Sequence, residues 1–339
     1  MILVPSYNQP KFSPNASWNP NAITFADSTI VGLAPRGIYI DTNNTIYVAD
    51  RTNNRIQIWL NGSTIPTKTI SGSLSTPSLV FVASIGDIYI SDDNVNPKVE
   101  QWSLNANRST AVMYTNLSCH GIFVDTSNTI YCSILSLHQV VKRWLNDNST
   151  TWSTVAGTGI AGNAANMLSG PRRIFVDTNL DLYVADFDNH RIQLFRLGQS
   201  NGTTVAGNGS GNFTITLNYP TAVILDADKY IFIADGWNNR IVGSGPYGFR
   251  CIVGCSLLNG STPDRLSFPA SLSFDSYGNL YVLDLNNNRL QKFLMEQNAS
   301  GKCTKHILNR LSVLYYSNAV TDFHLEKSRC ISTNTSRFH

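Results

Sequence analysis

Three kinds of side chain in this sequence have the chemistry for a functional site: histidines, cysteines and a recurrent aspartate–arginine pair. In four places an aspartate and an arginine stand five residues apart, and such a pair can form a charge-assisted hydrogen bond across a loop. We interpret these pairs as structural clamps, because catalysis rarely needs four copies of one pair. The pairs are Asp50 with Arg55, Asp186 with Arg191, Asp235 with Arg240, and Asp284 with Arg289.

The six histidines do not predict a metal site. His120, His138 and His190 are widely spaced along the chain, and the other three follow residue 305. An open catalytic zinc site needs three ligands that converge on the metal at about 2 Å. The sequence contains no G-x-S-x-G nucleophile motif and no phosphate-binding P-loop. We therefore predict no catalytic residues, no metal and no cofactor.

The six cysteines favour disulfides over a zinc site, because none of them has C-x-x-C spacing. Two pairs are close in sequence and a third is joined only by elimination: Cys119 with Cys132, Cys251 with Cys255, and Cys303 with Cys330. Disulfides imply an oxidising compartment. We expect an extracellular protein or the ectodomain of a longer one. Buried free thiols in a cytoplasmic protein are the alternative, since residues 1–5 do not resemble a signal peptide.

Composition limits the classes of partner. The charged fraction of 14% is well below the roughly 25% of typical domains. A formal net charge of +3 is weak for a protein that binds nucleic acid. No apolar run approaches the roughly 20 residues of a membrane-spanning helix. We therefore expect neither nucleic-acid binding nor a membrane span in this chain, and we expect a monomer.

A repeat organises most of the sequence. Six times, a short apolar strand ends at or near an aspartate, and a tight turn and a second strand follow. The aligned positions are Asp41, Ala83, Asp125, Asp177, Asp226 and Asp275, with gaps of 42, 42, 52, 49 and 49 residues. Third strands begin with arginine in most units, and their alternation predicts β structure. This period suits the blade of a β-propeller.

The third strands carry a motif that resembles the NHL repeat. The motif reads Asn189-His190-Arg191-Ile192, and Asn54-Arg55-Ile56, Asn239-Arg240-Ile241 and Asn288-Arg289-Leu290 are its equivalents. The resemblance implies an all-β, six-bladed propeller of four-stranded antiparallel blades over residues 20–296. An extension (1–19) precedes it, and an irregular tail of unknown structure (297–339) follows. The second and third units depart from the motif at Lys98, Ile134 and Gln139.

Closure of the ring needs one further strand. Six units supply first, second and third strands, but only five fourth strands lie between them. Residues 21–26 have the composition of a fourth strand. We predict that they pair with the last blade, which removes an exposed sheet edge.

The resemblance leaves three functions open: a docking module, a lyase- or lactonase-like enzyme, and a cytosolic propeller that binds RNA or proteins. Relatives include a zinc-dependent amidating lyase, calcium-binding lactonase-like enzymes, and cytosolic tripartite-motif propellers that bind RNA or proteins. We favour a non-catalytic module that docks a protein or glycan partner on one propeller face. Its candidate ligand-binding residues, chosen because arginine and aromatic side chains anchor interfaces, are Arg36, Arg51, His120, Arg172, Arg173, Phe187 and Trp237.

Glycosylation is expected mainly on the other face. Six N-x-S/T sites fall in turns that the meander topology places opposite the candidate residues: Asn43, Asn61, Asn107, Asn148, Asn201 and Asn298. Bulky glycans there would leave the face with the arginines as the accessible one.

Overall fold

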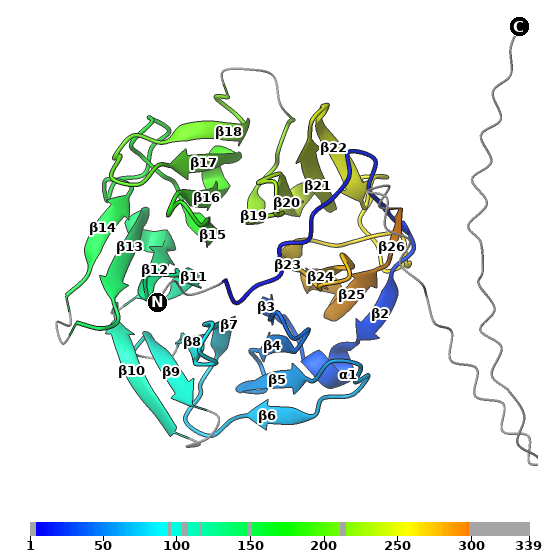
Figure 1. Cartoon of the computed structure of the whole chain (residues 1–339), viewed down its shortest axis with the longest axis horizontal. Coiled ribbons are helices and arrows are strands. Elements are labelled where there is room, and N and C mark those ends of the chain that lie inside the picture. The colour runs from blue at the N-terminus through cyan, green and yellow to red at the C-terminus, as the bar shows by residue number, and fades with distance from the viewer. Residues whose placement is uncertain are drawn as a thin grey trace, which may run out of the picture. The chain divides into compact units, whose positions relative to one another are not determined.

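The computed structural model describes residues 5–93, 96–103, 108–115, 117–147, 151–210 and 215–297. Within these ranges the chain forms six four-stranded antiparallel sheets arranged as blades around a central channel (Figure 1). The predicted six-bladed propeller is therefore confirmed. The tail, with its three histidines and the predicted Cys303–Cys330 pair, lies outside the described residues. The proposed domain boundaries stay predictions.

The strands of each blade follow one another outward from the channel. Blade 1 contains β3 (Gly37–Ile40), β4 (Ile46–Asp50), β5 (Arg55–Trp59) and β6 (Lys68–Ile70). Blade 2 contains β7 (Pro77–Val82), β8 (Ile88–Asp92), β9 (Lys98–Ser103) and β10 (Arg108–Tyr114). Blade 3 contains β11 (Cys119–Val124), β12 (Thr129–Ile134), β13 (Gln139–Trp144) and β14 (Ser153–Ala156). Blade 4 contains β15 (Pro171–Val176), β16 (Leu182–Asp186), β17 (Arg191–Phe195) and β18 (Thr203–Gly207).

Blade 5 contains β19 (Pro220–Leu225), β20 (Ile231–Asp235), β21 (Arg240–Gly245) and β22 (Gly248–Val253). Blade 6 contains β23 (Pro269–Phe274), β24 (Leu280–Asp284), β25 (Arg289–Phe293) and β2 (Ile23–Ala26). Among the described residues, helical structure is limited to α1 (Ser28–Val31) and to 3₁₀ turns at Leu135–Leu137, Phe187–Asn189, Gly236–Asn238 and Leu285–Asn287.

The predicted closure is confirmed. Strand β2 pairs antiparallel with β25, with Ile23 opposite Lys292 and Thr24 opposite Gln291. A strand from the start of the chain thus completes the last blade, so that β25 is not left as the edge strand of a three-stranded blade.

Aromatic side chains fill the middle of the channel. Tyr39, Phe81, Phe123 and Phe175 come from the first strands of blades 1 to 4. Their ring centroids lie 4.8, 4.8 and 5.2 Å apart in that order. Side chains along a strand alternate between the two faces of a blade, and both faces are buried. All four residues of β3 are buried for this reason. The channel is therefore lined mainly by apolar side chains, and the space left among them is a cavity of about 80 Å³.

The N-terminal segment has a structure that the sequence did not predict. Residues 5–18 run across one end of the channel, and the trace of this segment crosses the centre of the ring in Figure 1. The Asn8 side-chain amide donates to the backbone oxygens of Asp41 at 2.8 Å and Phe274 at 3.2 Å. The segment then ends in β1 (Ser17–Trp18), which pairs with β26 (Met295–Gln297).

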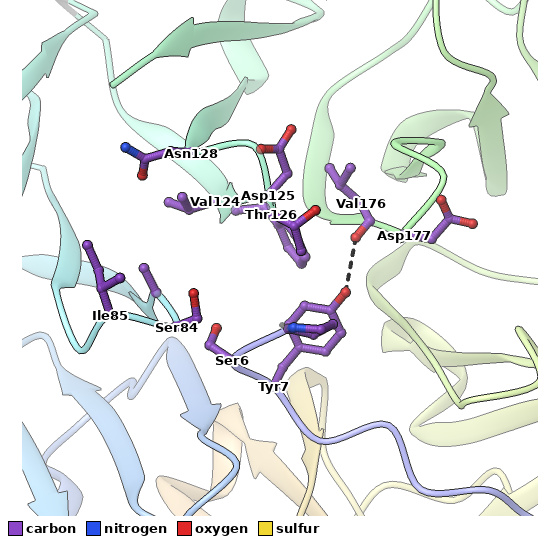
Figure 2. A pocket seen from close by; sticks show the side chains of 13 residues that line it. Ser6, Tyr7, Ser84, Ile85, Val124, Asp125, Thr126, Asn128, Val176 and Asp177 are labelled. Atoms are coloured by element: carbon purple, nitrogen blue, oxygen red, sulfur yellow. Dashed lines mark hydrogen bonds between the residues drawn. The ribbon is translucent and has the colours of Figure 1, made fainter. Parts of the chain in front are cut away.

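Tyr7 is the residue that closes this end of the channel. Its ring lies 5.4 Å from that of Phe123 and 5.1 Å from that of Phe175. Its hydroxyl donates to the backbone oxygen of Val176 at 3.4 Å (Figure 2). The space left beside it, next to Asp125, is a cavity of about 20 Å³, which is room for about one water molecule.

The N-terminal segment also covers a buried carboxyl group. The Asp226 side chain is fully buried, and Oδ1 accepts hydrogen bonds from the backbone amides of Asp228 at 3.0 Å and Tyr230 at 2.8 Å. Within the described part of the chain, Oδ2 has no hydrogen-bond partner. Burial raises the pKa of Asp226 to about 6.

Replacing Asp226 by asparagine is expected to stabilise the protein at about pH 7.5, by up to about 3 kcal/mol. Asparagine keeps the acceptor Oδ1 and removes a buried charge. A raised folded-state pKa contributes stability below the unfolded pKa of about 4, and this stability is lost as the pH rises through about 6. The gain in melting temperature should therefore disappear at about pH 4. The partly exposed Asp228→Asn is the control. An equal gain at both pH values would contradict the prediction.

Two of the predicted disulfides are present. Cys119 and Cys132 join β11 to β12 with a Cα–Cα distance of 5.4 Å, and Cys251 and Cys255 are bonded with a Cα–Cα distance of 5.7 Å. Both distances fall within the usual range of roughly 4.4–6.8 Å. The two bonds indicate an oxidising environment. Among the described residues, no helix is long and apolar enough to cross a bilayer.

Candidate functional site

The candidate site lies at the channel end opposite the N-terminal segment, and one position of each repeat builds it. In five blades the first strand begins with a register shift relative to the second strand. Such bulges redirect side chains. The side chains at this position line one cavity of about 170 Å³, in blade order Arg36, Ser78, His120, Arg172, Thr221 and Ala270.

Blade 4 places two arginines in the cavity. Its register shift spans both Arg172 and Arg173, and both line the cavity, although consecutive residues of a regular strand point in opposite directions. The Arg173 guanidinium donates to the backbone oxygens of Ala270 in blade 6, at 3.2 Å, and of Arg36 in blade 1. It therefore reaches across the channel axis. Most other blades have small residues at its repeat position, namely Gly37, Gly121, Ala222 and Ser271.

The cavity carries unpaired positive charge. Within the described ranges, neither Arg36, Arg172 nor Arg173 forms an ion pair with a carboxylate. Burial, followed by the charge of Arg36, lowers the pKa of Arg172 to about 10. Burial and the two other arginines lower the pKa of Arg173 to about 9. Both groups stay protonated at neutral pH.

Two other titratable groups line the cavity. The Asp93 side chain accepts a hydrogen bond from Ser78 Oγ at 3.1 Å and lies 3.9 Å from the Arg51 guanidinium. Burial raises its pKa. Burial also lowers the pKa of His120 to about 4, against the effect of its hydrogen bond with the Ser118 oxygen, and the nearby arginines add to the lowering. His120 is therefore neutral at physiological pH.

An aromatic cluster borders the cavity. Phe187, Tyr219, Trp237 and Phe268 form it, with ring centroids 4.8, 5.6 and 6.4 Å apart in that order. Phe268 also lines the cavity. The Arg172 guanidinium stacks on Phe187 with its carbon 3.7 Å from the ring centroid, a favourable cation–π geometry. Trp237 is 60% exposed, so the cluster presents an apolar surface beside the cationic cavity.

The structure thus brings the seven predicted face residues to one end of the propeller. Four of them line the cavity, Arg51 and Phe187 lie against its walls, and Trp237 lies in the aromatic cluster. Sequence reasoning missed Ser78, Asp93, Thr221 and Phe268. The signal that would have found Ser78 and Thr221 is their place after the proline that opens most first strands.

His138 and His190 have a structural role instead. Each ends a 3₁₀ turn in the left-handed region. Their Nδ1 atoms accept hydrogen bonds from the next blade, from the backbone amides of Gly170 at 3.1 Å and Tyr219 at 3.0 Å. At the same position in other blades, Asn54, Asn239 and Asn288 make the equivalent bond. In the described part of the chain, no three His, Cys, Asp or Glu side chains are grouped to hold a metal ion.

The repeated aspartate–arginine pairs flank the loops that link second and third strands, with the aspartate ending one strand and the arginine beginning the next. In all four, the arginine Nε donates to an aspartate oxygen at 2.7 or 2.8 Å. Each of these aspartates is fully buried.

The structure describes three of the six predicted glycosylation sites, and all three are exposed: Asn43, Asn61 and Asn201. The other three lie outside the described residues: Asn107, Asn148 and Asn298. Glycosylation of all six stays a prediction.

Fold and site together define a six-bladed propeller that is closed by its own N-terminal segment at one end and carries a cationic cavity at the other. The NHL-repeat family model matches residues 34–59, 168–195 and 266–293. These matches fall in blades 1, 4 and 6. The chain is therefore a six-bladed β-propeller in which blades 1, 4 and 6 carry NHL repeats.

Solved structures share the fold at low identity. A Bacteroides thetaiotaomicron protein of unknown function has a TM-score of 0.64 and 12% identity, over 86% of this chain and 76% of that one. Streptogramin B lyase has a TM-score of 0.58 and 14% identity, over 81% and 97%. A chain of a nidogen/laminin complex has a TM-score of 0.51 and 18% identity, over 62% and 74%. These similarities concern the fold alone. A search of curated proteins found no match.

Proposed function

We propose that this propeller is a non-catalytic extracellular module that docks a protein partner on the face formed by the cationic cavity and the aromatic cluster. The observation that carries the proposal is the contact between the two features, in which Arg172 stacks on Phe187 at the cavity wall. Arginine and large aromatic side chains supply most of the binding energy at protein interfaces. A chain of the nidogen/laminin complex has a similar fold, which supports the proposal by analogy.

The two ends of the propeller differ in a way that favours this face. Beside the N-terminal segment the cavities measure about 20 and 80 Å³, whereas the end with the arginines has one of about 170 Å³. A concave site with a few polar groups and an apolar rim is the usual form of a binding site. The two disulfides suit a protein that works outside the cytoplasm.

Trp237→Ala is expected to weaken partner binding by about 2 kcal/mol, roughly thirtyfold, as truncation of an interface anchor does. Tyr277→Ala is the matched control, because Tyr277 is 64% exposed, against 60% for Trp237, and lies in the β23–β24 turn at the opposite end. The measurement is capture of secreted proteins on the immobilised propeller, with the bound proteins compared between variants.

A partner that is retained by the wild type and Tyr277→Ala but lost by Trp237→Ala supports the proposal. If every captured protein binds the two variants equally, or is lost only with Tyr277→Ala, this face is not the docking surface.

A further inference from the structure

The guanidinium groups of the cavity form no ion pair with a carboxylate of the described residues. Arg36, Arg172 and Arg173 all line the cavity, and among the described residues Asp93 is the one acidic side chain that does so. The Nε of Arg172 is buried and makes no hydrogen bond to the described residues. Leaving cationic groups partly buried without an anion is costly, and a bound anion with good geometry offsets the cost. The cavity therefore has the charge of an anion site.

The walls of the cavity restrict the anion. Asp93 lies on one wall, and its side chain is 6% exposed. The three arginines outnumber this carboxylate, so the cavity attracts anions. Leu79, Phe268 and Leu285 form an apolar part of the lining. Methylene groups that precede a carboxylate can pack there, whereas inorganic phosphate has none. Shape thus favours an anion on a short aliphatic chain.

The direction from which an anion can enter the cavity indicates that the anion is part of a macromolecule. The N-terminal segment closes the far end of the channel through Tyr7, so a ligand enters from the face that carries the aromatic cluster. Trp237 and Phe268 lie 6.4 Å apart on that face, with Phe268 at the cavity itself. A partner whose side chain enters the cavity would rest its neighbouring residues on these rings.

We propose that the cavity binds the side-chain carboxylate of a glutamate or aspartate in an acidic segment of the partner protein, held by Arg36, Arg172 and Arg173. This proposal rests on the docking face proposed above and identifies what that face recognises. Arg172 lines the cavity, and Phe187 holds its guanidinium plane in place.

The first experiment uses a small probe and needs no partner. Binding of N-acetylglutamate N-methylamide to the full chain is measured by NMR, through the arginine Nε–H signals and the His120 ring signal. N-acetylglutamine N-methylamide and inorganic phosphate are the comparison ligands. We expect the carboxylate probe to bind about tenfold or more tightly than its amide, the difference that a charged hydrogen bond makes. We also expect it to bind more tightly than phosphate, and to raise the pKa of His120.

Matched substitutions locate the site. Arg172→Gln and Arg36→Gln should each weaken binding of the carboxylate probe about tenfold. Arg196→Gln removes the same charge from the exposed β17–β18 turn and should change the affinity by less than about twofold. Melting temperatures establish that each variant folds, and Arg172→Lys replaces Arg172→Gln if the latter does not.

The proposal is wrong if the carboxylate and amide probes bind equally, if phosphate binds more tightly than the carboxylate, or if Arg196→Gln has the same effect as Arg172→Gln. These outcomes differ from a failure of the docking face. If Trp237→Ala abolishes partner capture while Arg172→Gln and Arg36→Gln do not, the face docks a partner without a carboxylate in the cavity. If none of these substitutions affects capture but the carboxylate probe binds as predicted, the cavity binds carboxylates and the docking face lies elsewhere.

Discussion

Replacing Asp284 by alanine is expected to lower the free energy of unfolding by about 3–5 kcal/mol, because it leaves the buried Arg289 guanidinium without its counter-charge. Asp284 is fully buried and Arg289 is 9% exposed. Arg289 Nε donates to Asp284 Oδ2 at 2.8 Å. The same carboxylate accepts hydrogen bonds from the Asn287 side chain at 2.8 Å and from the Ser267 backbone amide at 2.6 Å. The substitution therefore removes three bonds and strands one charge.

The loss should spread beyond the pair. The other nitrogens of Arg289 donate to the backbone oxygens of Ser261, Thr262 and Arg265. These oxygens belong to the segment that connects blade 5 to blade 6. If the Arg289 guanidinium moves into solvent in the variant, its hydrogen bonds to this segment break. We therefore expect faster hydrogen exchange at residues 261–267 in the variant.

Asp228→Ala is the control, since Asp228 pairs with Lys11 at 2.8 Å at the surface, where the lysine side chain is 70% exposed. Exposed pairs contribute about 0–1 kcal/mol. Urea unfolding followed by fluorescence measures both variants. A cost for Asp284→Ala no larger than that for Asp228→Ala would show that the clamp is not a main source of stability.

Removing the Cys119–Cys132 disulfide by substituting both residues with alanine is expected to cost about 3 kcal/mol. The bond closes a loop with a sequence separation of 13, and both cysteines are buried, at 3% and 0% exposure. The Cys251–Cys255 bond closes a loop with a separation of only 4. In the chain-entropy model the shorter loop contributes less, about 2 kcal/mol.

We expect removal of the Cys119–Cys132 bond to destabilise the protein more than removal of the Cys251–Cys255 bond. Each double-alanine variant is compared with the wild type by urea unfolding under non-reducing conditions. Burial of the Cys119–Cys132 pair adds a packing loss to the entropic one, which strengthens the expected order. A larger cost for the Cys251–Cys255 pair would mean that local strain or packing in blade 5 outweighs loop closure.

Much of the architecture could be predicted because it depends on local pattern. The period of 42–52 residues and the alternation of the strands predicted six blades. Counting strands then predicted that residues 21–26 complete the last blade, which the pairing of β2 with β25 confirms. The second and third units also form complete four-stranded blades despite Lys98, Ile134 and Gln139, because apolar strand residues, not the motif, form the blade core.

The arrangement of the site was harder to predict from the sequence. The sequence placed Arg36, His120, Arg172 and Arg173 on one face through the topology of a meander. It did not explain how the neighbours Arg172 and Arg173 can line the same cavity, because alternation in a regular strand sends consecutive side chains apart. The bulge at the start of β15 reverses that expectation. His138 and His190 are a second case, since only the interblade hydrogen bonds show that they act as asparagines do elsewhere in the ring.

The sequence by itself determined the number of blades, the strand that closes the ring and the two local disulfides, because each depends on spacing along the chain. Only the tertiary structure decided what lies at the axis. Residues 36, 120 and 172 are separated by whole blades in sequence, and ring closure brings them to one cavity. The N-terminal segment has no periodic pattern, so its place across the channel depends on contacts with distant residues such as Asp41, Val176 and Phe274. No local rule encodes such contacts.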